Sequence, residues 1–280
     1  MAQNLSAPGA PIRRAQGKGD DFAQSRQFEW LARAGIATRG VIYAIIGVLA
    51  IKLALGSGGE TTNQQGALSE IAKQPFGKAL LIFMAIGLAG YAIWRLVRAA
   101  IGHGPEASDD AKERIDGVVS GIGYVSLCIT AISILMGSGS GDSGGPGKTT
   151  GGVLGWPGGQ ILVGIAALII IAVGLEQGYK GITKKLCEKS KTEQMSEHVK
   201  RFFTALGVFG HLARMVVFAL IGYFLLRAAI DYDPDKAIGL DGALAALRDA
   251  SYGPFLLGVV AAGLIGFAAY SIVDARYRKV

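Results

Sequence analysis

Six long apolar segments, arranged as three successive pairs, are the feature that most constrains what this chain can fold into. Each segment has about 20 residues or more, enough for a helix to cross a hydrocarbon layer of ~30 Å. Inside lipid a backbone must satisfy its own hydrogen bonds, so these segments are expected to be helices rather than strands. The segments cover residues 35–55, 77–101, 115–136, 157–182, 206–230 and 253–273.

Composition supports an all-α polytopic membrane protein. Of the 280 residues, 51% are hydrophobic and only 18% are charged, whereas about a quarter of the residues in a soluble domain are charged. The chain also contains 42 glycines. Small side chains allow helix backbones to approach each other in lipid, so this glycine content fits a tightly packed bundle.

The three pairs are copies of one unit. Gly35 and Arg39 in the first pair correspond to Gly210 and Arg214 in the third. The middle copy is looser, and Ser120 stands in the place of the arginine. Repeats with two spans keep the same orientation in the membrane, so the sequence predicts six helices as three tandem two-helix repeats around a pseudo-threefold axis along the membrane normal.

The segments that join the two spans of each repeat differ. In the first and third copies, residues 67–72 and 243–247 have apolar residues at helical spacing and are expected to form amphipathic turns at the outer membrane interface. In the middle copy, the corresponding stretch, residues 137–152, is rich in Gly and Ser and is expected to be a flexible linker.

These landmarks resemble a known family. Arg39, the run Gly66 to Leu68, the run Pro75 to Leu81, and the series Gly87, Tyr91, Trp94 and Arg95 are similar to the pattern of the bacterial membrane proteins grouped as domain of unknown function 1206. The resemblance covers roughly residues 28–278 and implies a two-span unit present three times in the plasma membrane. It implies no reaction, ligand or catalytic residue.

The organisation along the chain follows from the repeats. We expect a disordered cytoplasmic tail, three hairpin repeats and a basic cytoplasmic connection before the third repeat. The respective ranges are 1–25 for the tail, 26–104 and 112–183 for the first two repeats, 184–201 for the connection and 202–280 for the third repeat.

Basic residues predict the orientation. Most of the 28 lysine and arginine residues lie in the tail, in the connections that follow the second and the fourth apolar segments, and at the C-terminus. The positive-inside rule then places both termini in the cytoplasm, as expected for a multi-pass protein of the bacterial plasma (inner) membrane. The same distribution explains the net charge of +7 by contact with anionic lipid headgroups, so we expect membrane lipids, and no nucleic acid, as partners.

Three loop motifs resemble chemical sites, but the sequence favours simpler interpretations. Residues 141–146 match the nucleophile signature of serine proteases, yet no histidine is placed to form a triad with Ser143. Residues 144–150 resemble a phosphate loop, but the first required glycine is replaced by Asp142. The alternating aspartates at 231–235 resemble the start of a calcium loop whose later ligands are missing, so a solvated acidic loop is the simpler reading.

Ionisable residues within the spans are the candidate site, since charges in hydrocarbon are costly and often functional. The simpler interpretation is that they reach toward the headgroups and pair to fix helix register. The sharper hypothesis is that Arg39, Arg214 and Glu176 line a polar vestibule for a small anion or a proton. The full candidate intramembrane polar cluster is Arg39, Arg214, Glu176, His211 and Asp274.

The sequence therefore favours a non-enzymatic structural or accessory membrane component. The alternative is a small-solute or ion permeation protein with a polar vestibule near the pseudo-threefold axis. No catalytic residue, cofactor-binding residue or metal ligand is expected, and no small-molecule substrate is identified. Lipids and other membrane proteins are the expected partners. A polar cavity at the centre would favour permeation, a dry packed centre the structural role, and an exposed apolar groove a lipid or a partner helix.

Overall fold

The computed structural model describes residues 26–56, 63–101, 111–137 and 146–279. The predicted tail at 1–25 and most of the protease-like motif lie outside these ranges. Within them the fold is all-α, as predicted. Six helices are long and apolar enough to cross a membrane: α2 (Arg26–Ala54), α4 (Gly77–Ile101), α5 (Ala111–Leu135), α7 (Gly159–Ile182), α8 (Glu197–Ile230) and α10 (Gly253–Tyr277).

The shorter elements join these helices. Their bounds are α3 (Gln64–Lys73), α6 (Pro146–Leu154) and α9 (Leu240–Asp249), with single 3-10 turns η1 (Lys185–Cys187), η2 (Thr192–Gln194) and η3 (Pro234–Lys236). The predicted amphipathic turns are confirmed as α3 and α9. Their apolar faces are buried within the protein, since Leu68 and Leu244 are both fully covered.

The prediction of a flexible linker in the middle copy is wrong for residues 146–152, which belong to α6. Pro146 occupies the first helical position, where its missing N–H is no loss. Thr150 and Leu154 are buried, and α6 packs against η3, where Gly147 and Gly151 lie against Pro234. Tertiary contact thus overrides the low helix propensity of a Gly-rich segment.

The same turn leads into the second span of all three repeats. Phe76, Gly158 and Tyr252 each adopt a left-handed conformation with φ of 62°, 75° and 60°, and a glycine follows each of them. A Cβ on Gly77 would lie only 1.9 Å from the carbonyl oxygen of Ile71, so the glycine allows the new span to start directly against the preceding short helix. The shared turn supports the repeat even in the loosely matched middle copy.

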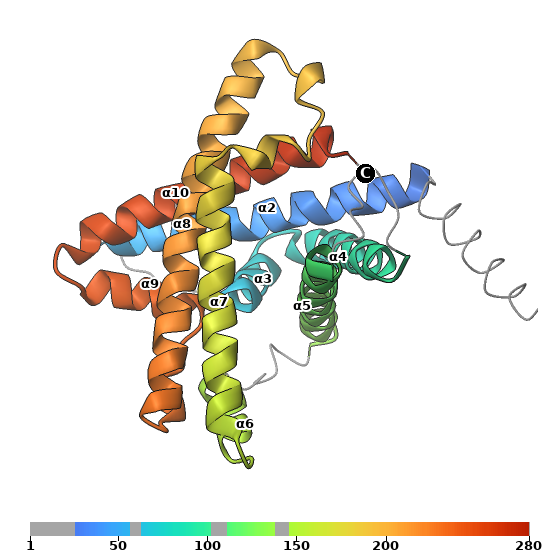
Figure 1. Ribbon diagram of the computed structural model, residues 1–280. Helices are drawn as coiled ribbons and strands as arrows, with labels where there is room; N and C mark the ends of the chain where they lie inside the picture. Colours follow the sequence, from blue (N-terminus) through green and yellow to red (C-terminus); the bar gives the residue numbers. More distant parts are fainter. Residues whose placement is uncertain (1–25, 57–62, 102–110, 138–145, 280) are drawn as a thin grey trace, which may run out of the picture.

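Helix contacts follow one order through the molecule: α7, α8, α10, α2, α4, α5. Figure 1 shows the antiparallel pair α7 and α8 crossing the antiparallel pair α2 and α10, with α4 and α5 beyond α2. The most extensive contacts join the second span of one repeat to the first span of the next, that is, α4 to α5, α7 to α8 and α10 to α2.

These three inter-repeat interfaces use equivalent positions of the repeats. At each position, a small side chain on one helix faces a larger side chain on the other. Near the charged ends, Gly40 faces Ala268 and Ile272, Gly121 faces Ala92 and Leu96, and Gly174 and Gly178 face Met215. Two turns further along, Gly47 faces Ala261 and Ile265, Gly222 faces Ala167 and Ile171, and the thiol of Cys128 lies 3.5 Å from the carbonyl oxygen of Ala85.

The first and third hairpins also pack alike internally. Gly35 on α2 lies against Tyr91 on α4, and the corresponding Gly210 on α8 lies against Phe267 on α10. A Cβ on either glycine would fall within 2.6 Å of its aromatic neighbour, so each pair of spans approaches as closely as glycine allows.

The middle hairpin is open. Within the described residues α5 and α7 make at most marginal contact. The glycines that join the other two hairpins are missing here, because Asp116 corresponds to Gly35 and Ile169 corresponds to Gly87. Without this close approach the facing apolar residues stay exposed, among them Val119 and Ile169. The closed ring that a pseudo-threefold axis requires therefore stays a prediction.

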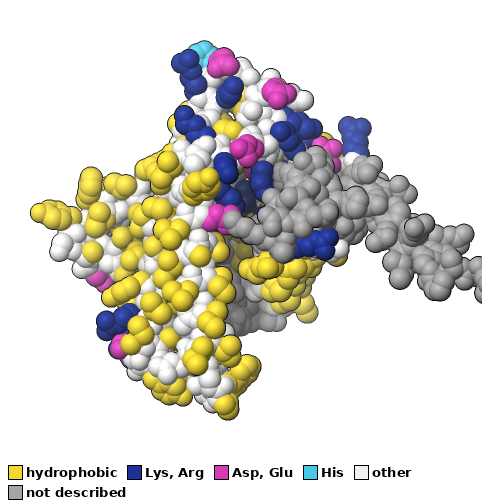
Figure 2. All heavy atoms as spheres, viewed as in Figure 1, with side chains coloured by type: hydrophobic (Ala, Val, Ile, Leu, Met, Phe, Trp, Pro, Cys, Tyr) yellow, Lys and Arg dark blue, Asp and Glu magenta, His cyan; other side chains and the backbone are white. Residues whose placement is uncertain are grey.

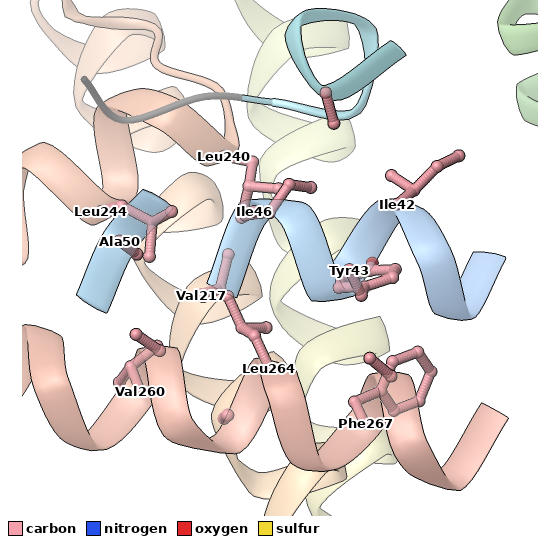
Figure 3. Packing of buried hydrophobic residues seen from close by; sticks show 14 of the residues in the cluster. Ile42, Tyr43, Ile46, Ala50, Val217, Leu240, Leu244, Val260, Leu264 and Phe267 are labelled. Atoms are coloured by element: carbon pink, nitrogen blue, oxygen red, sulfur yellow. The ribbon is translucent and has the colours of Figure 1, made fainter. Parts of the chain in front are cut away.

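The core lies between α2, α8, α10 and the short helices (Figure 3). Leu264 of α10 and Val217 lie between α2 and α10, Ile46 lies on the other side of α2 near Leu240, and Leu244 of α9 lies beside Ala50. The outer surface carries many exposed aliphatic side chains, and Figure 2 shows them covering the α7 and α8 pair, with charged side chains gathered toward one end. This pattern is that of a protein whose sides face lipid.

Candidate functional site

Two of the predicted cations converge on one aromatic ring. The guanidinium carbon of Arg39 on α2 lies 5.1 Å from the centroid of the Phe267 ring on α10, and that of Arg214 on α8 lies 4.5 Å from it. Gly210 lets α10 approach α8 at this level, so Phe267 sits between the helices that carry the two arginines. Cation–π contacts of this kind stabilise a desolvated guanidinium group by about 2 kcal/mol.

Asp274 provides the negative charge. Its side chain is fully buried at the last turns of α10, and it lies 3.7 Å from the Arg39 guanidinium and 3.3 Å from that of Arg278. Ser190 donates a hydrogen bond of 2.7 Å to the other carboxylate oxygen. One carboxylate thus ties α2, the end of α10 and the connection before α8 to one another.

That connection is docked onto the end of α10. Ser190 and Arg278 form an isolated antiparallel bridge. The backbone N–H of Lys191 donates to the carbonyl of Tyr277 at 2.7 Å. Leu186 and Met195 are buried. The basic connection predicted at 184–201 is therefore an ordered cover over the Asp274 carboxylate, and α8 already begins at Glu197.

Arg214 and His211 complete the aromatic part of the cluster. The Arg214 guanidinium also lies 5.5 Å from the Tyr43 ring and 5.3 Å from the Phe218 ring. His211 is buried, with its Nδ1 2.7 Å from the carbonyl oxygen of Gly207 and its ring against those of Phe267 and Tyr270.

Glu176 differs from the other four predicted residues. It forms an ion pair of 3.1 Å with Lys180, one turn further along α7, and both side chains are partly exposed. The structure thus gathers Arg39, Arg214 and His211 around Phe267, joins Asp274 to them through Arg39, and gives Glu176 a partner on its own helix. Since a vestibule requires open space between the cations, the filling of this space by aromatic rings favours a role in packing.

Sequence reasoning missed Ser190, Arg278 and Phe267. Ser190 and Arg278 lie outside the apolar segments, and no spacing pattern connects them to Asp274. Phe267 could have been found from the repeat, because it occupies the place of Tyr91, which stacks on Trp94 and lies under the Arg95 guanidinium in the first copy. Both copies thus place an arginine over this aromatic position.

The acidic loop after α8 is neutralised by nearby cations. The carboxylate of Asp231 accepts a hydrogen bond of 2.8 Å from Lys236 and pairs with Arg227 at 3.1 Å. These contacts, the hydrogen bond from Lys236 above all, lower the pKa of Asp231. Asp233 caps the short turn η3 by accepting from the backbone N–H of Asp235. This arrangement agrees with a solvated loop stabilised by exposed ion pairs.

The cysteines and the possible metal ligands are the remaining groups with potential for chemistry. Cys128 and Cys187 are both free. No group of three or more His, Cys, Asp or Glu residues that could hold a metal ion occurs among the described residues.

The fold and the charged cluster define a class, namely a multi-pass helical membrane protein built from three two-helix repeats. The family described as Domain of Unknown Function (DUF1206) matches the chain three times, at residues 34–108, 115–184 and 209–278. The chain belongs to this family. The three matches correspond to the three pairs of spans, including the loosely related middle one.

One relative extends the comparison to bacteria. The chain is 33% identical over 253 residues to a Bacillus subtilis (strain 168) protein described as "Uncharacterized protein YxxB". The alignment covers 89% of this chain and 90% of the Bacillus protein, so the similarity extends over most of both chains. No solved structure matches the chain.

Replacement of Asp274 by Asn should destabilise the folded protein by about 3 kcal/mol, because it leaves two buried arginines without their counter-charge. The shape and the hydrogen bond from Ser190 can be retained by the amide. The measurement is unfolding of the purified protein in mixed micelles with rising denaturing detergent.

Asp249→Asn is the matched control. Its carboxylate is exposed and pairs only with the neighbouring Arg248 in the described structure, so little change is expected. Equal stability of the two variants would contradict a structural role for the Asp274 ion pairs.

Proposed function

We propose that this protein is a non-enzymatic structural or accessory component of the bacterial plasma membrane, whose role is to hold another membrane helix. The observation that carries the proposal is the combination of a filled interior with an open middle hairpin. Apolar side chains fill the space between α2, α8 and α10 (Figure 3). The apolar faces of α5 and α7 are uncovered.

The open hairpin presents apolar surfaces suited to packing by another helix. The side chains of Val119 and Ile122 on α5 and of Ile165 and Ile169 on α7 are half exposed or more. In the other two repeats the counterparts of Val119, Thr38 and Ala213, are buried, and the glycines at the place of Ile169, Gly87 and Gly263, lie against the facing span. A third helix of similar apolar character would satisfy both faces without requiring any polar contact.

The runner-up function is permeation of a small anion. The observation in its favour is the excess of cations in the charged cluster, where Arg39 and Arg278 both pair with the carboxylate of Asp274 and Arg214 lies over the Phe267 ring. Against it, the Arg214 guanidinium is enclosed by the rings of Tyr43, Phe218 and Phe267, which leave it no evident route to a passing ion.

The proposed orientation places both termini and the charged cluster on the cytoplasmic side. The docked connection between α7 and α8 carries most of its charge as lysine, and it lies beside the C-terminal end of α10. The positive-inside rule favours the cytoplasm for such a surface.

Fusions at the ends test this orientation. Green fluorescent protein attached after Val280 should fluoresce, and alkaline phosphatase at the same place should be inactive, because the first folds in the cytoplasm and the second outside it. Insertion of the phosphatase after Gly137 should give the opposite result. Active phosphatase at the C-terminus would refute the proposed orientation.

Site-specific photo-crosslinking in cells tests the helix-holding role. A photoreactive residue at Ile122 or Ile169 should capture a specific membrane protein, because both positions face the open hairpin. The same residue at Ile82, exposed on α4, is the control and should capture only lipid.

Anion efflux from proteoliposomes tests the alternative. The proposal predicts no efflux above that of empty liposomes. Efflux that is lost in Arg39→Gln and Arg214→Gln, together with equal cross-linking at Ile122 and Ile82, would overturn the proposal in favour of permeation.

A further inference from the structure

A groove of about 640 Å³ lies between α2, α4 and α10. Its walls are mainly apolar, formed by Ala34, Ala37, Phe83 and Ile272. Its mouth, at the N-terminal end of α2, is lined by Trp30 and by three arginines with one glutamate: Arg26, Arg33, Arg276 and Glu29. The volume falls within the range of small-molecule sites, roughly 300–1,000 Å³.

The charges at the mouth do not cancel. Arg33 pairs with Glu29 and donates hydrogen bonds to the carbonyls of Ala275 and Arg276 at the end of α10. Arg33 therefore serves the structure, and Glu29 neutralises it. Arg26 and Arg276 remain exposed on either side of the mouth, and neither has an acidic partner among the described residues. Two cations at the opening of an apolar groove complement an anionic headgroup carried on an acyl chain.

The length of the groove agrees with this occupant. From Arg26 to Ala37 the axis of α2 rises about 16 Å at 1.5 Å per residue, which is close to half of a ~30 Å hydrocarbon layer. Ile272, which borders the groove, packs against Gly40. The groove thus follows α2 inward from the end of the bundle that carries its cations.

Trp30 adds a second sign of the interface. Its side chain is 64% exposed, and it lies about one helical turn after Arg26 on α2 and one turn before the apolar wall at Ala34. Tryptophan at this depth is typical of the membrane–water interface, where one edge of the indole contacts acyl chains and its N–H meets polar groups.

We propose that this groove binds an anionic phospholipid, with the phosphate between Arg26 and Arg276 and one acyl chain along Ala34, Ala37 and Phe83. The site joins the first and last helices of the chain, so a bound lipid bridges α2 and α10 at the end of the bundle. The inference depends on the protein being embedded in a membrane and not on the proposed partner helix.

Quenching of Trp30 fluorescence by lipids brominated on their acyl chains measures the binding directly. The full chain carries Trp156→Phe to remove the other exposed tryptophan, and Trp94 is buried. It is placed in phosphatidylcholine bilayers with increasing brominated phosphatidylglycerol or brominated phosphatidylcholine. We expect phosphatidylglycerol to be preferred roughly tenfold, since each basic residue near a surface favours anionic lipid severalfold.

The variants separate the headgroup from the acyl chain. Arg26→Gln with Arg276→Gln should remove the preference for phosphatidylglycerol. The control, Arg227→Gln with Arg248→Gln in the last turns of α8 and α9, should keep this preference. Ala37→Phe should weaken quenching by both lipids alike, because the larger side chain fills the apolar part of the groove.

Three outcomes would overturn the proposal. The first is equal quenching by the two lipids in the unsubstituted groove. The second is a preference that survives loss of Arg26 and Arg276. The third is a preference for phosphatidylglycerol that emerges only under one of two conditions. If deletion of residues 1–25 is required, the groove is occupied by the chain's own tail. If dilution of the protein in the bilayer is required, the groove is occupied by a second copy.

Discussion

The close approach of helix backbones at glycine is the constraint on which the rest of this structure depends. Lipid surrounds the outer faces, so burial of apolar surface gives helices little reason to associate. Association must come from contact, and contact improves when one side has no Cβ. Gly35, Gly47, Gly210 and Gly222 each lie where a Cβ would fall within about 2.6 Å of a neighbouring helix. Where the glycine is missing, as at Ile169, the two spans stay apart.

The size exchange across the interfaces explains how a repeated unit has kept one packing through different residues. Gly47 faces Ile265 and Gly222 faces Ile171, while Cys128 lies on the α4 backbone at Ala85. In the first two contacts the larger side chain lies on the second span of a repeat, whereas Cys128 lies on a first span. The backbones keep a similar spacing in all three interfaces. Compensation of this kind preserves packing density without preserving sequence.

Much of the fold could be predicted from the sequence, and the reason lies in the strength of the signal. A run of about 20 apolar residues has few alternatives to a helix across a membrane, so all six long helices were predicted. The amphipathic helices α3 and α9 were visible in the spacing of Leu68 and Ile71 and of Leu244 and Leu247. The helix α6 was not, because its stability comes from packing of Gly147 and Gly151 on Pro234, which lies far away in the sequence.

The charged cluster was only partly predictable for a similar reason. A charge within an apolar run is conspicuous, which is how Arg39, Arg214 and Asp274 were found. Their partners are ordinary residues by sequence. Ser190 is one serine in a polar connection, and it gains its role because this connection folds back onto the end of α10. The choice between a vestibule and a packed cluster likewise depends on Phe267, whose ring fills the space between the two arginines.

Disulfide formation in native membranes tests the equivalence of the three inter-repeat interfaces most directly. The pairs are Gly47→Cys with Ile265→Cys, Gly222→Cys with Ile171→Cys, and native Cys128 with Ala89→Cys, with other cysteines replaced. We expect all three pairs to cross-link readily on mild oxidation, whereas Val119→Cys with Ile169→Cys in the open middle hairpin should not cross-link. Rapid cross-linking of this last pair, or failure of the Cys128 and Ala89→Cys pair, which replaces no glycine, would contradict the equivalence of the interfaces.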